Sequence, residues 1–182
     1  MNYCSHCAAL VIFEIPQDDN RPRYICTSCG RIHYQNPKIV VGCIPVWDDR
    51  ILLCKRNIEP RKGFWTLPAG YLECNETTEE GARRETSEET GGTVIGLQQY
   101  RLFDIAHIGQ VYLMFLAQLR TPEFHVTEES MDVRLFEEKD IPWSNIAFPV
   151  IEKTLQHYFA DRLVNDFPFR LDQITERMKK NH

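Results

Sequence analysis

Hydrophobic and polar positions along the chain alternate in segments that predict an α/β protein. Apolar and β-branched runs bounded by polar turns are typical of strands. They predict strands over residues 38–47, 51–55, 94–103, 110–119 and 132–136. An amphipathic helix is predicted over residues 146–159, and a second, polar helix precedes the third strand. Strands interleaved with two main helices indicate a mixed sheet that is covered on both faces.

The polar helix is predicted from its two ends. Thr77 and Glu80 have the spacing of a capping box at the amino-terminal end. The helix then runs to about Thr90 and stops at Gly91-Gly92, because glycine is the usual residue after a helix.

The charges on this helix are unevenly matched. Glu79 and Arg83, like Glu80 and Arg84, stand four residues apart, a spacing at which ion pairs form on a helix. Three carboxylates on one face are left over: Glu85, Glu88 and Glu89. They repel one another, and magnesium and manganese prefer oxygen ligands of this kind. The cluster therefore predicts a site for a hard divalent cation.

Composition and charge narrow the class of protein. The chain of 182 residues is long enough for one substantial core plus a small accessory module. A net charge of −5 argues against a general nucleic-acid binder, which would normally present a basic face. No apolar run approaches the roughly 20 residues needed to cross a bilayer, and the first ten residues lack the features of a secretory signal. We therefore expect a cytoplasmic protein without a membrane partner, whose cysteines are thiols or metal ligands.

Four cysteines form two C-x2-C pairs near the amino terminus: Cys4, Cys7, Cys26 and Cys29. This spacing matches a tetrahedral Cys4 site for structural zinc, and a redox pair or a disulfide is the alternative. Short β-prone pieces over residues 11–15 and 23–25 complete the pattern of a zinc ribbon, which is too small to fold without metal. His6 and His33 could each replace a cysteine ligand, but four thiolates suffice and we expect surface roles for both.

The segment around the acidic helix carries a specific motif. Residues 70–92 read GYLECNETTEEGARRETSEETGG and match G-x5-E-x7-R-E-U-x-E-E-x-G-U, where U is aliphatic. Every fixed position is occupied: Gly70, Glu76, Arg84, Glu85, Glu88, Glu89 and Gly91. Thr86 and Gly92 depart from the aliphatic positions, which concerns helix packing rather than chemistry. The chain therefore resembles the Nudix hydrolases, whose signature box this is.

The resemblance implies a fold and a division into domains. The expected fold class is α/β, with a Nudix α/β/α sandwich that has a mixed sheet. A small Cys4 zinc ribbon over residues 1–35 precedes the Nudix hydrolase domain over residues 36–162. Residues 163–182 are expected to form a C-terminal tail.

The resemblance also implies metal-dependent hydrolysis of the pyrophosphate bond of a nucleoside diphosphate derivative. By position in the box, Glu85 and Glu89 are expected to bind Mg²⁺ or Mn²⁺, with Glu88 ligating directly or through water. The Gly70 carbonyl is expected as a further ligand. Arg84 is expected to orient Glu85, because ligating carboxylates need support of their own.

The signature box does not fix the roles of the remaining candidate site residues. The family often takes its general base from a loop before the last strand, where Glu128 and Glu129 lie, and Glu88 is the alternative base. Arg56 could contact phosphate or remain a solvated loop cation, and Glu73 could join the site. Three aromatic residues could stack on a base, although we expect them in the core: Phe64, Trp65 and Tyr71.

Residues 33–74 and 104–119 resemble zinc-ribbon Nudix hydrolases related to plant FAD and ADP-ribose pyrophosphatases. That likeness implies a homodimer that splits FAD or ADP-ribose into AMP plus FMN or ribose 5-phosphate. NADH pyrophosphatases also pair a ribbon with this box, but the SQPWPFP-type segment that follows their box is absent here. The other alternative is a non-catalytic protein that senses nucleotides or binds nucleic acid, and the complete set of carboxylates argues against it.

Overall fold

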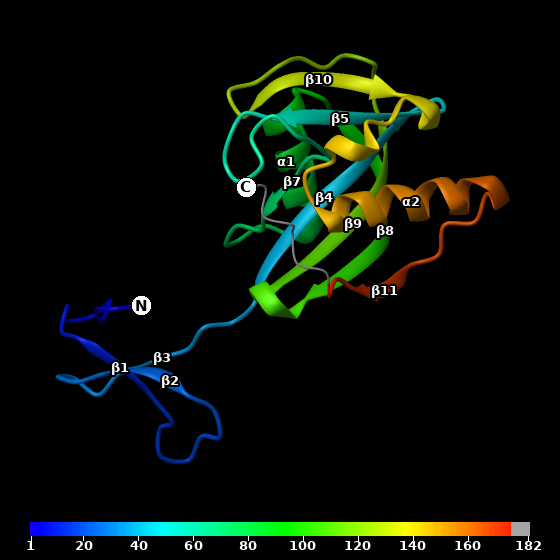
Figure 1. Ribbon diagram of the computed structural model, residues 1–182. Coiled ribbons are helices and arrows are strands. Elements are labelled where there is room, and N and C mark those ends of the chain that lie inside the picture. Colours follow the sequence, from blue (N-terminus) through cyan, green and yellow to red (C-terminus); the bar gives the residue numbers. More distant parts are fainter. Residues whose placement is uncertain (176–182) are drawn as a thin grey trace. The chain divides into compact units, whose positions relative to one another are not determined.

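The structure is a computed structural model that describes residues 1–175 (Figure 1). The chain divides after Pro37 into two units, Met1–Pro37 and Lys38–His182, which we describe one at a time. None of the helices in the described range is both long and apolar enough to cross a membrane.

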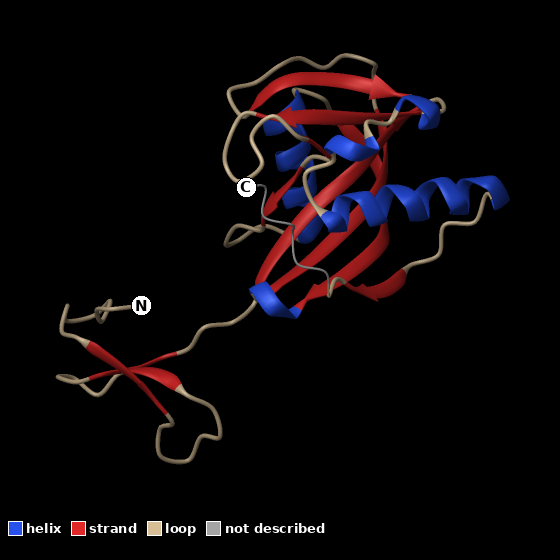
Figure 2. Cartoon of the chain, viewed as in Figure 1, coloured by secondary structure: helices blue, strands red, loops and turns tan. Residues whose placement is uncertain are grey.

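The first unit contains a three-stranded antiparallel sheet in the order β1-β2-β3 (Figure 2). Its strands are short: β1 (Val11–Glu14), β2 (Arg23–Cys26) and β3 (Ile32–His33). β1 and β2 confirm the two β-prone pieces that the sequence predicts in this region.

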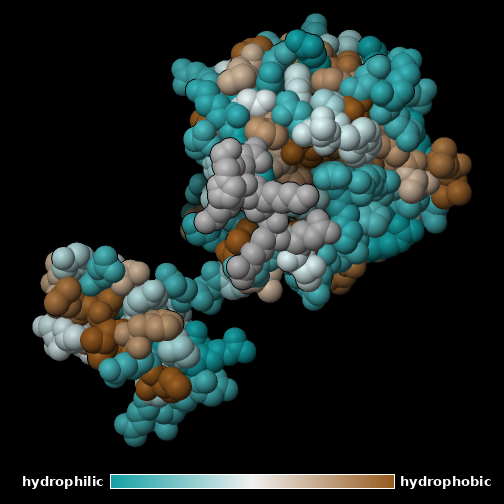
Figure 3. Space-filling view, in the orientation of Figure 1, coloured by the Kyte–Doolittle hydropathy of each residue, from teal (hydrophilic) through white to brown (hydrophobic). Residues whose placement is uncertain are grey.

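This unit has almost no core of its own. Its buried residues are Cys4, Pro16 and Cys26. Apolar side chains such as Phe13 and Tyr34 are instead more than half exposed, and Figure 3 shows apolar patches on the surface of this unit. Since so little apolar area is buried, the cysteine region has to supply much of what holds the sheet together.

The second unit is built on one eight-stranded sheet. Its main path is β10-β5-β4-β9-β8-β11, while β6 pairs with β5 and β7 pairs with β4. The strands are β4 (Lys38–Trp47), β5 (Arg50–Arg56), β6 (Trp65–Thr66), β7 (Ala69–Tyr71), β8 (Val94–Ile105), β9 (Gln110–Leu119), β10 (Ser130–Phe136) and β11 (Arg170–Gln173). β4 runs parallel to β9 and β8 runs parallel to β11, so the sheet is mixed. All five strands predicted here are confirmed.

Two helices cover opposite faces of this sheet (Figure 1): α1 (Thr78–Thr90) and α2 (Pro149–Val164). One core cluster joins Ala82 of α1 to Phe115, and a second joins Leu155 of α2 to Met114. Met114 and Phe115 are neighbours on β9, and consecutive side chains of a strand point to opposite faces. The α/β/α sandwich with a mixed sheet is thus confirmed.

α1 is fixed by its own sequence at both ends. The Thr77 hydroxyl accepts a hydrogen bond from Glu80 N–H at 3.2 Å, and the Glu80 carboxylate accepts one from Thr77 N–H at 2.7 Å. The predicted capping box is therefore present. Gly91 ends the helix with a φ of 66°, which glycine adopts without steric cost. Gly81 allows close packing on the sheet, because a Cβ there would lie 2.9 Å from the Val41 side chain.

The C-terminal part of the chain departs from the sequence prediction. α2 begins at Pro149 rather than Ile146, because proline lacks an N–H and is suited to the first helical position. The helix then continues to Val164, beyond the predicted end at Phe159. β11 lies within the segment 163–182, of which residues 176–182 are outside the described range.

A buried arginine ties β11 to the sheet and to α2. Arg101 of β8 is fully buried and donates to the Asp161 carboxylate at 2.6 Å and to the Pro168 carbonyl at 2.8 Å. Arg170 of β11 and the Tyr100 hydroxyl donate to the same carboxylate at 2.9 and 2.7 Å. A buried ion pair needs such additional hydrogen bonds to offset its desolvation. The network fixes the C-terminal strand against the edge of the sheet.

Candidate active site

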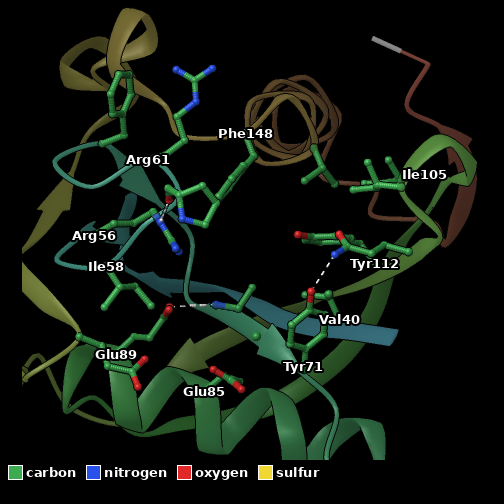
Figure 4. A pocket seen from close by; sticks show the side chains of 18 of the residues that line it. Val40, Arg56, Ile58, Arg61, Tyr71, Glu85, Glu89, Ile105, Tyr112 and Phe148 are labelled. Atoms are coloured by element: carbon green, nitrogen blue, oxygen red, sulfur yellow. Dashed lines mark hydrogen bonds between the residues drawn. The ribbon is translucent and has the colours of Figure 1, made fainter. Parts of the chain in front are cut away.

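A pocket of about 1390 Å³ in the second unit lies beside α1 and reaches the start of α2 (Figure 4). Eight of the predicted site residues outside the ribbon line it, whereas Glu76 and Glu128 do not. The eight are Arg56, Gly70, Glu73, Arg84, Glu85, Glu88, Glu89 and Glu129. They come from β5, from β7 and the loop after it, from α1 and from the loop before β10. The fold thus brings four separate segments to one cavity.

Glu85 and Glu89 of α1 are buried, with 7% and 5% of their surface exposed. The Glu89 carboxylate accepts hydrogen bonds from Ala69 N–H at 3.0 Å and from the Cys54 thiol at 3.5 Å. Burial raises the pKa of Glu89 to about 8, although the Ala69 N–H opposes this shift, and the charge of Glu85 adds to it. Burial also raises the pKa of Glu85. A bound cation would favour the ionised form of both carboxylates.

Two glycines allow close approach around β7, Gly70 to the Glu85 carboxylate and Gly42 to the backbone at Pro68 and Ala69. A Cβ at Gly70 would overlap this carboxylate. Gly42 of β4 has a similar role beneath β7, because a Cβ there would lie 2.6 Å from the Pro68 carbonyl. Both positions therefore need glycine for close approach rather than for an unusual backbone conformation.

Arg84 binds three carboxylates at once. It donates to Glu76 at 2.7 Å, to Glu85 at 2.7 Å and to Glu88 at 2.9 Å. The bond from Arg84, together with one from the Glu73 backbone N–H, lowers the pKa of Glu76 to about 2. The predicted pair between Arg84 and Glu80 is wrong, because the Glu80 carboxylate is engaged in the capping box. The expectation that Glu85 and Glu88 lack a compensating charge is also wrong, since both share this guanidinium.

The donor groups in the pocket suit a hard divalent cation, since they are carboxylate and carbonyl oxygens. Among residues 1–175, the carboxylates of Glu85, Glu88 and Glu89 do not converge within 4.8 Å as a set of three. Arg84 bridges two of them, because its Nη1 donates to Glu85 at 2.7 Å and to Glu88 at 2.9 Å. Glu88 also remains exposed, unlike the other two.

The two loop candidates for the general base, Glu128 and Glu129, lie side by side before β10 but differ in their relation to the pocket. Glu129 lines the pocket, whereas Glu128 is not among the lining residues. Asn57 holds this loop, because its side chain donates to the Glu128 carbonyl at 3.0 Å and its backbone N–H donates to the Glu129 carbonyl at 2.9 Å. The Thr127 hydroxyl adds a bond of 3.4 Å to the Glu89 carbonyl. The sequence did not reveal Asn57, because no local pattern links it to a loop about 70 positions later.

Arg56 and two of the three aromatic residues also face the cavity. Arg56 is half-buried, donates to the Pro60 carbonyl at 2.9 Å and lies 5.1 Å from the centre of the Phe148 ring. Phe64 and Tyr71 line the pocket, so the expectation of core packing is wrong for these two. Trp65 is buried in the core as expected. Glu73 is exposed at the pocket rim.

The four amino-terminal cysteines form a second candidate metal site. Their sulfur atoms all lie within 4.8 Å of one another, with Cys4 and Cys29 at 3.8 Å and Cys7 and Cys26 at 3.4 Å. Four sulfurs around one zinc ion would be about 3.8 Å apart, given a Zn–S distance near 2.3 Å. Backbone N–H groups lower the pKa of Cys26 to about 6. The cluster therefore fits zinc.

His33 has a closer relation to this cluster than expected. Its Nε2 lies 3.3 Å from the Cys4 sulfur, so the prediction of a spare surface role is wrong. The backbone N–H of His6 also donates to that sulfur, at 3.4 Å, while the His6 side chain is exposed. Hydrogen bonds to a ligating atom of this kind orient it and tune its basicity.

Family models match both units of the chain. A zinc-ribbon model described as Nudix N-terminal matches residues 2–35, and a model described as NUDIX domain matches residues 36–156. A crystal structure of a NUDIX hydrolase from Nitrosomonas europaea is 48% identical, with a TM-score of 0.91. The match covers 96% of this chain and 99% of that one.

Curated relatives match over shorter parts of their length. An ADP-ribose pyrophosphatase of Methanocaldococcus jannaschii is 48% identical over 58 residues, which are 32% of this chain and 34% of that protein. The NAD-capped RNA hydrolase NudC of Vibrio parahaemolyticus is 27% identical over 168 residues, which are 88% of this chain and 62% of that protein. The chain thus spans about a third of the first relative and under two thirds of the second.

Proposed function

The chain belongs to the Nudix hydrolases, and we propose that it hydrolyses the pyrophosphate bond of FAD or ADP-ribose, releasing AMP plus FMN or ribose 5-phosphate. The observation that carries this proposal is that one pocket gathers Glu85, Glu88 and Glu89 of the box together with Arg56 and Glu129. A pyrophosphate group is densely anionic, so it requires a site in which cations and directed donors can balance its charge.

Glu85, Glu89 and the Gly70 carbonyl are the groups that would hold Mg²⁺ or Mn²⁺, with Glu88 in direct or water-mediated contact. Bound there, the metal would neutralise the pyrophosphate and lower the pKa of a water molecule. Arg84 orients Glu85 and Glu88 through the two bonds described above. Glu89 is buried, so its own carboxylate meets little solvent.

The protein groups then act on the water and the phosphate. Glu129 takes a proton from the attacking water, whose oxygen forms a new bond to phosphorus. The bond from that phosphorus to the bridging oxygen breaks, and the leaving phosphate keeps the electron pair and is protonated by solvent. Arg56 binds a phosphate oxygen and so limits repulsion as the water approaches.

The comparisons support a nucleotide substrate. One relative is named an ADP-ribose pyrophosphatase. This agrees with the resemblance of residues 33–74 and 104–119 to FAD and ADP-ribose pyrophosphatases. NAD-capped RNA or NADH is the second candidate substrate. It is favoured by the NudC relative, whose similarity extends over 88% of this chain.

A substrate screen with the full chain and magnesium tests the proposal. FAD, ADP-ribose, NADH and NAD-capped RNA are incubated separately, and the products are separated by chromatography. AMP should appear from FAD or ADP-ribose, and Glu89→Gln should reduce its rate at least a hundredfold. Glu79→Gln is the matched control, because Glu79 lies on the same helix outside the pocket. Absence of AMP from both FAD and ADP-ribose would overturn the proposal, and product from NADH or NAD-capped RNA alone would favour the second candidate.

A further inference from the structure

The pocket has two chemically different ends. In Figure 4, Glu85 and Glu89 lie along α1, whereas Phe148 and Ile105 lie on the side away from that helix. The acidic end suits metal and phosphate, as proposed above. The other end is walled mainly by apolar and aromatic side chains, with Arg61 beside them, and the proposed reaction does not use it.

A row of residues from three strands forms one wall of this apolar end. Val40 of β4 is in register with Tyr71 of β7 and with Tyr112 of β9. Residues in register on neighbouring strands share a face of the sheet, so the three side chains lie side by side. The Tyr71 hydroxyl accepts a hydrogen bond from Gln110 at 2.9 Å. The Tyr112 hydroxyl has no hydrogen bond to any described residue, which leaves it available to a ligand.

Phe148 faces this row from the residue before α2. Its ring is half-buried and reaches into the cavity (Figure 4). The Arg56 guanidinium lies 5.1 Å from the centre of the ring and connects it to the phosphate end. A flat ring between Phe148 and the tyrosine row would have π surfaces on both sides, the arrangement in which aromatic groups attract each other.

The C-terminal strand completes the far wall. Ile174 directly follows β11, is 6% exposed and lines the pocket together with Ile105 and Val150. Its backbone N–H donates to the Asp104 carbonyl at 3.0 Å, which sets its position beside β8. The buried Arg101 network described above holds the strand in place. The segment that the sequence leaves as a tail is therefore part of the pocket wall.

We propose that this end of the pocket binds the adenine ring of the substrate, between Phe148 and the row of Tyr71, Val40 and Tyr112, with Ile174 closing the far side. The inference rests on the proposed function, because FAD, ADP-ribose and NADH all carry adenine. Tyr112 stands at one end of this row, beyond Val40, so its hydroxyl hydrogen-bonds the polar edge of the ring while Phe148, Val40 and Tyr71 cover the faces.

Equilibrium binding of two non-hydrolysable probes tests this in the presence of magnesium. α,β-Methylene-ADP carries adenine, and methylenediphosphonate is the matched probe without a ring. Phe148→Leu should raise the Kd of the adenine probe by roughly 5- to 100-fold, the range for loss of one stacked base. Tyr112→Phe should raise it severalfold without disturbing the fold. Neither variant should change the Kd of methylenediphosphonate by more than about twofold.

Phe169→Ala is the control, since this phenylalanine is exposed and lies outside the pocket. Thermal unfolding of each variant shows whether it folds. Equal weakening of both probes, or no change for either, would overturn the adenine site. The binding assay does not depend on turnover, so it separates this inference from the proposed reaction. If ring-dependent binding were found in a protein that hydrolyses none of the four compounds, the reaction would fail and the site would stand.

Discussion

The two candidate metal sites of this chain are assembled in different ways. The four cysteine sulfurs already lie within 4.8 Å of one another in a unit that buries almost nothing else. The carboxylates of the pocket come from α1, from the loop after β7 and from the loop before β10, and Arg84 binds two of them, Glu85 and Glu88. In the first unit, metal would supply the stability. In the second unit, the hydrophobic core supplies the stability, and a bound metal would supply positive charge to the carboxylates of the pocket.

Removal of zinc should have the largest effect and tests the first half of this comparison. Cys26→Ser removes one of the two buried sulfurs of the cluster. Because structural zinc contributes on the order of 10 kcal/mol to the folding of such units, the ribbon should unfold. Elemental analysis should show one zinc per chain before the change and almost none after it. Limited proteolysis should then cut residues 1–37 first.

Cys74→Ser is the matched control for this experiment. Cys74 is exposed and lies outside the cysteine cluster, so its replacement should leave the zinc content unchanged. Full zinc retention in Cys26→Ser, or cleavage at the same rate as in the control, would show that the ribbon does not depend on the metal.

Much of the fold could be predicted because its signals are local. β4 and β9 were predicted with their observed bounds, and α1 carries its capping box and its terminal glycine within the segment itself. β11 was missed because RLDQ is short and polar, and its position depends on the buried Arg101. A strand of this kind is defined by tertiary contacts rather than by periodicity.

The site shows the same division. The box and the C-x2-C pairs could be recognised from spacing alone. Burial, by contrast, cannot be seen in the sequence, and it separates Glu85 and Glu89 from the exposed Glu88. The role of Asn57 in holding the Glu129 loop also requires the fold, since the two segments meet only in three dimensions.

Replacement of the candidate base should have the next largest effect. Glu129 lines the pocket and Glu128 does not, although they are adjacent in the chain and both are exposed. Glu129→Gln should lower kcat by about 10²- to 10⁴-fold at neutral pH, because a positioned general base contributes this much. Glu128→Gln should change kcat less than about threefold. Steady-state rates on the substrate that the screen identifies measure both.

The pH profile of these variants makes the test sharper. Loss of the base should flatten the acidic limb of kcat for Glu129→Gln, while Glu128→Gln should keep the shape of the unmodified enzyme. If both variants lost activity equally and kept the pH dependence of the unmodified enzyme, the loss would be due to the reduced negative charge of the loop. That result would assign the base to another residue, with Glu88 as the first to examine.

The smallest expected effect concerns protons rather than rates. Burial raises the pKa of Glu89 to about 8, so this group is mostly protonated at pH 6.5 in the metal-free protein. A divalent cation binds the ionised form, so its binding should release close to one proton from Glu89 at pH 6.5 and about a tenth of that at pH 9, and the raised pKa of Glu85 adds to the release at the lower pH. Calorimetry with Mn²⁺ in buffers of different ionisation enthalpy measures the number released.

The same raised pKa has a consequence for stability without metal. The folded chain holds this proton more tightly than the unfolded chain, in which a glutamate titrates near its ordinary value. The free energy of unfolding should therefore decrease as pH rises from about 5 to about 8. Glu89→Gln removes this slope if it comes from that group, and Glu79→Gln should preserve it. If the slope persisted unchanged in Glu89→Gln, the pH dependence of the free energy of unfolding would come from another group. The acidic pocket would then not differ from the cysteine cluster in the way that the buried Glu89 predicts.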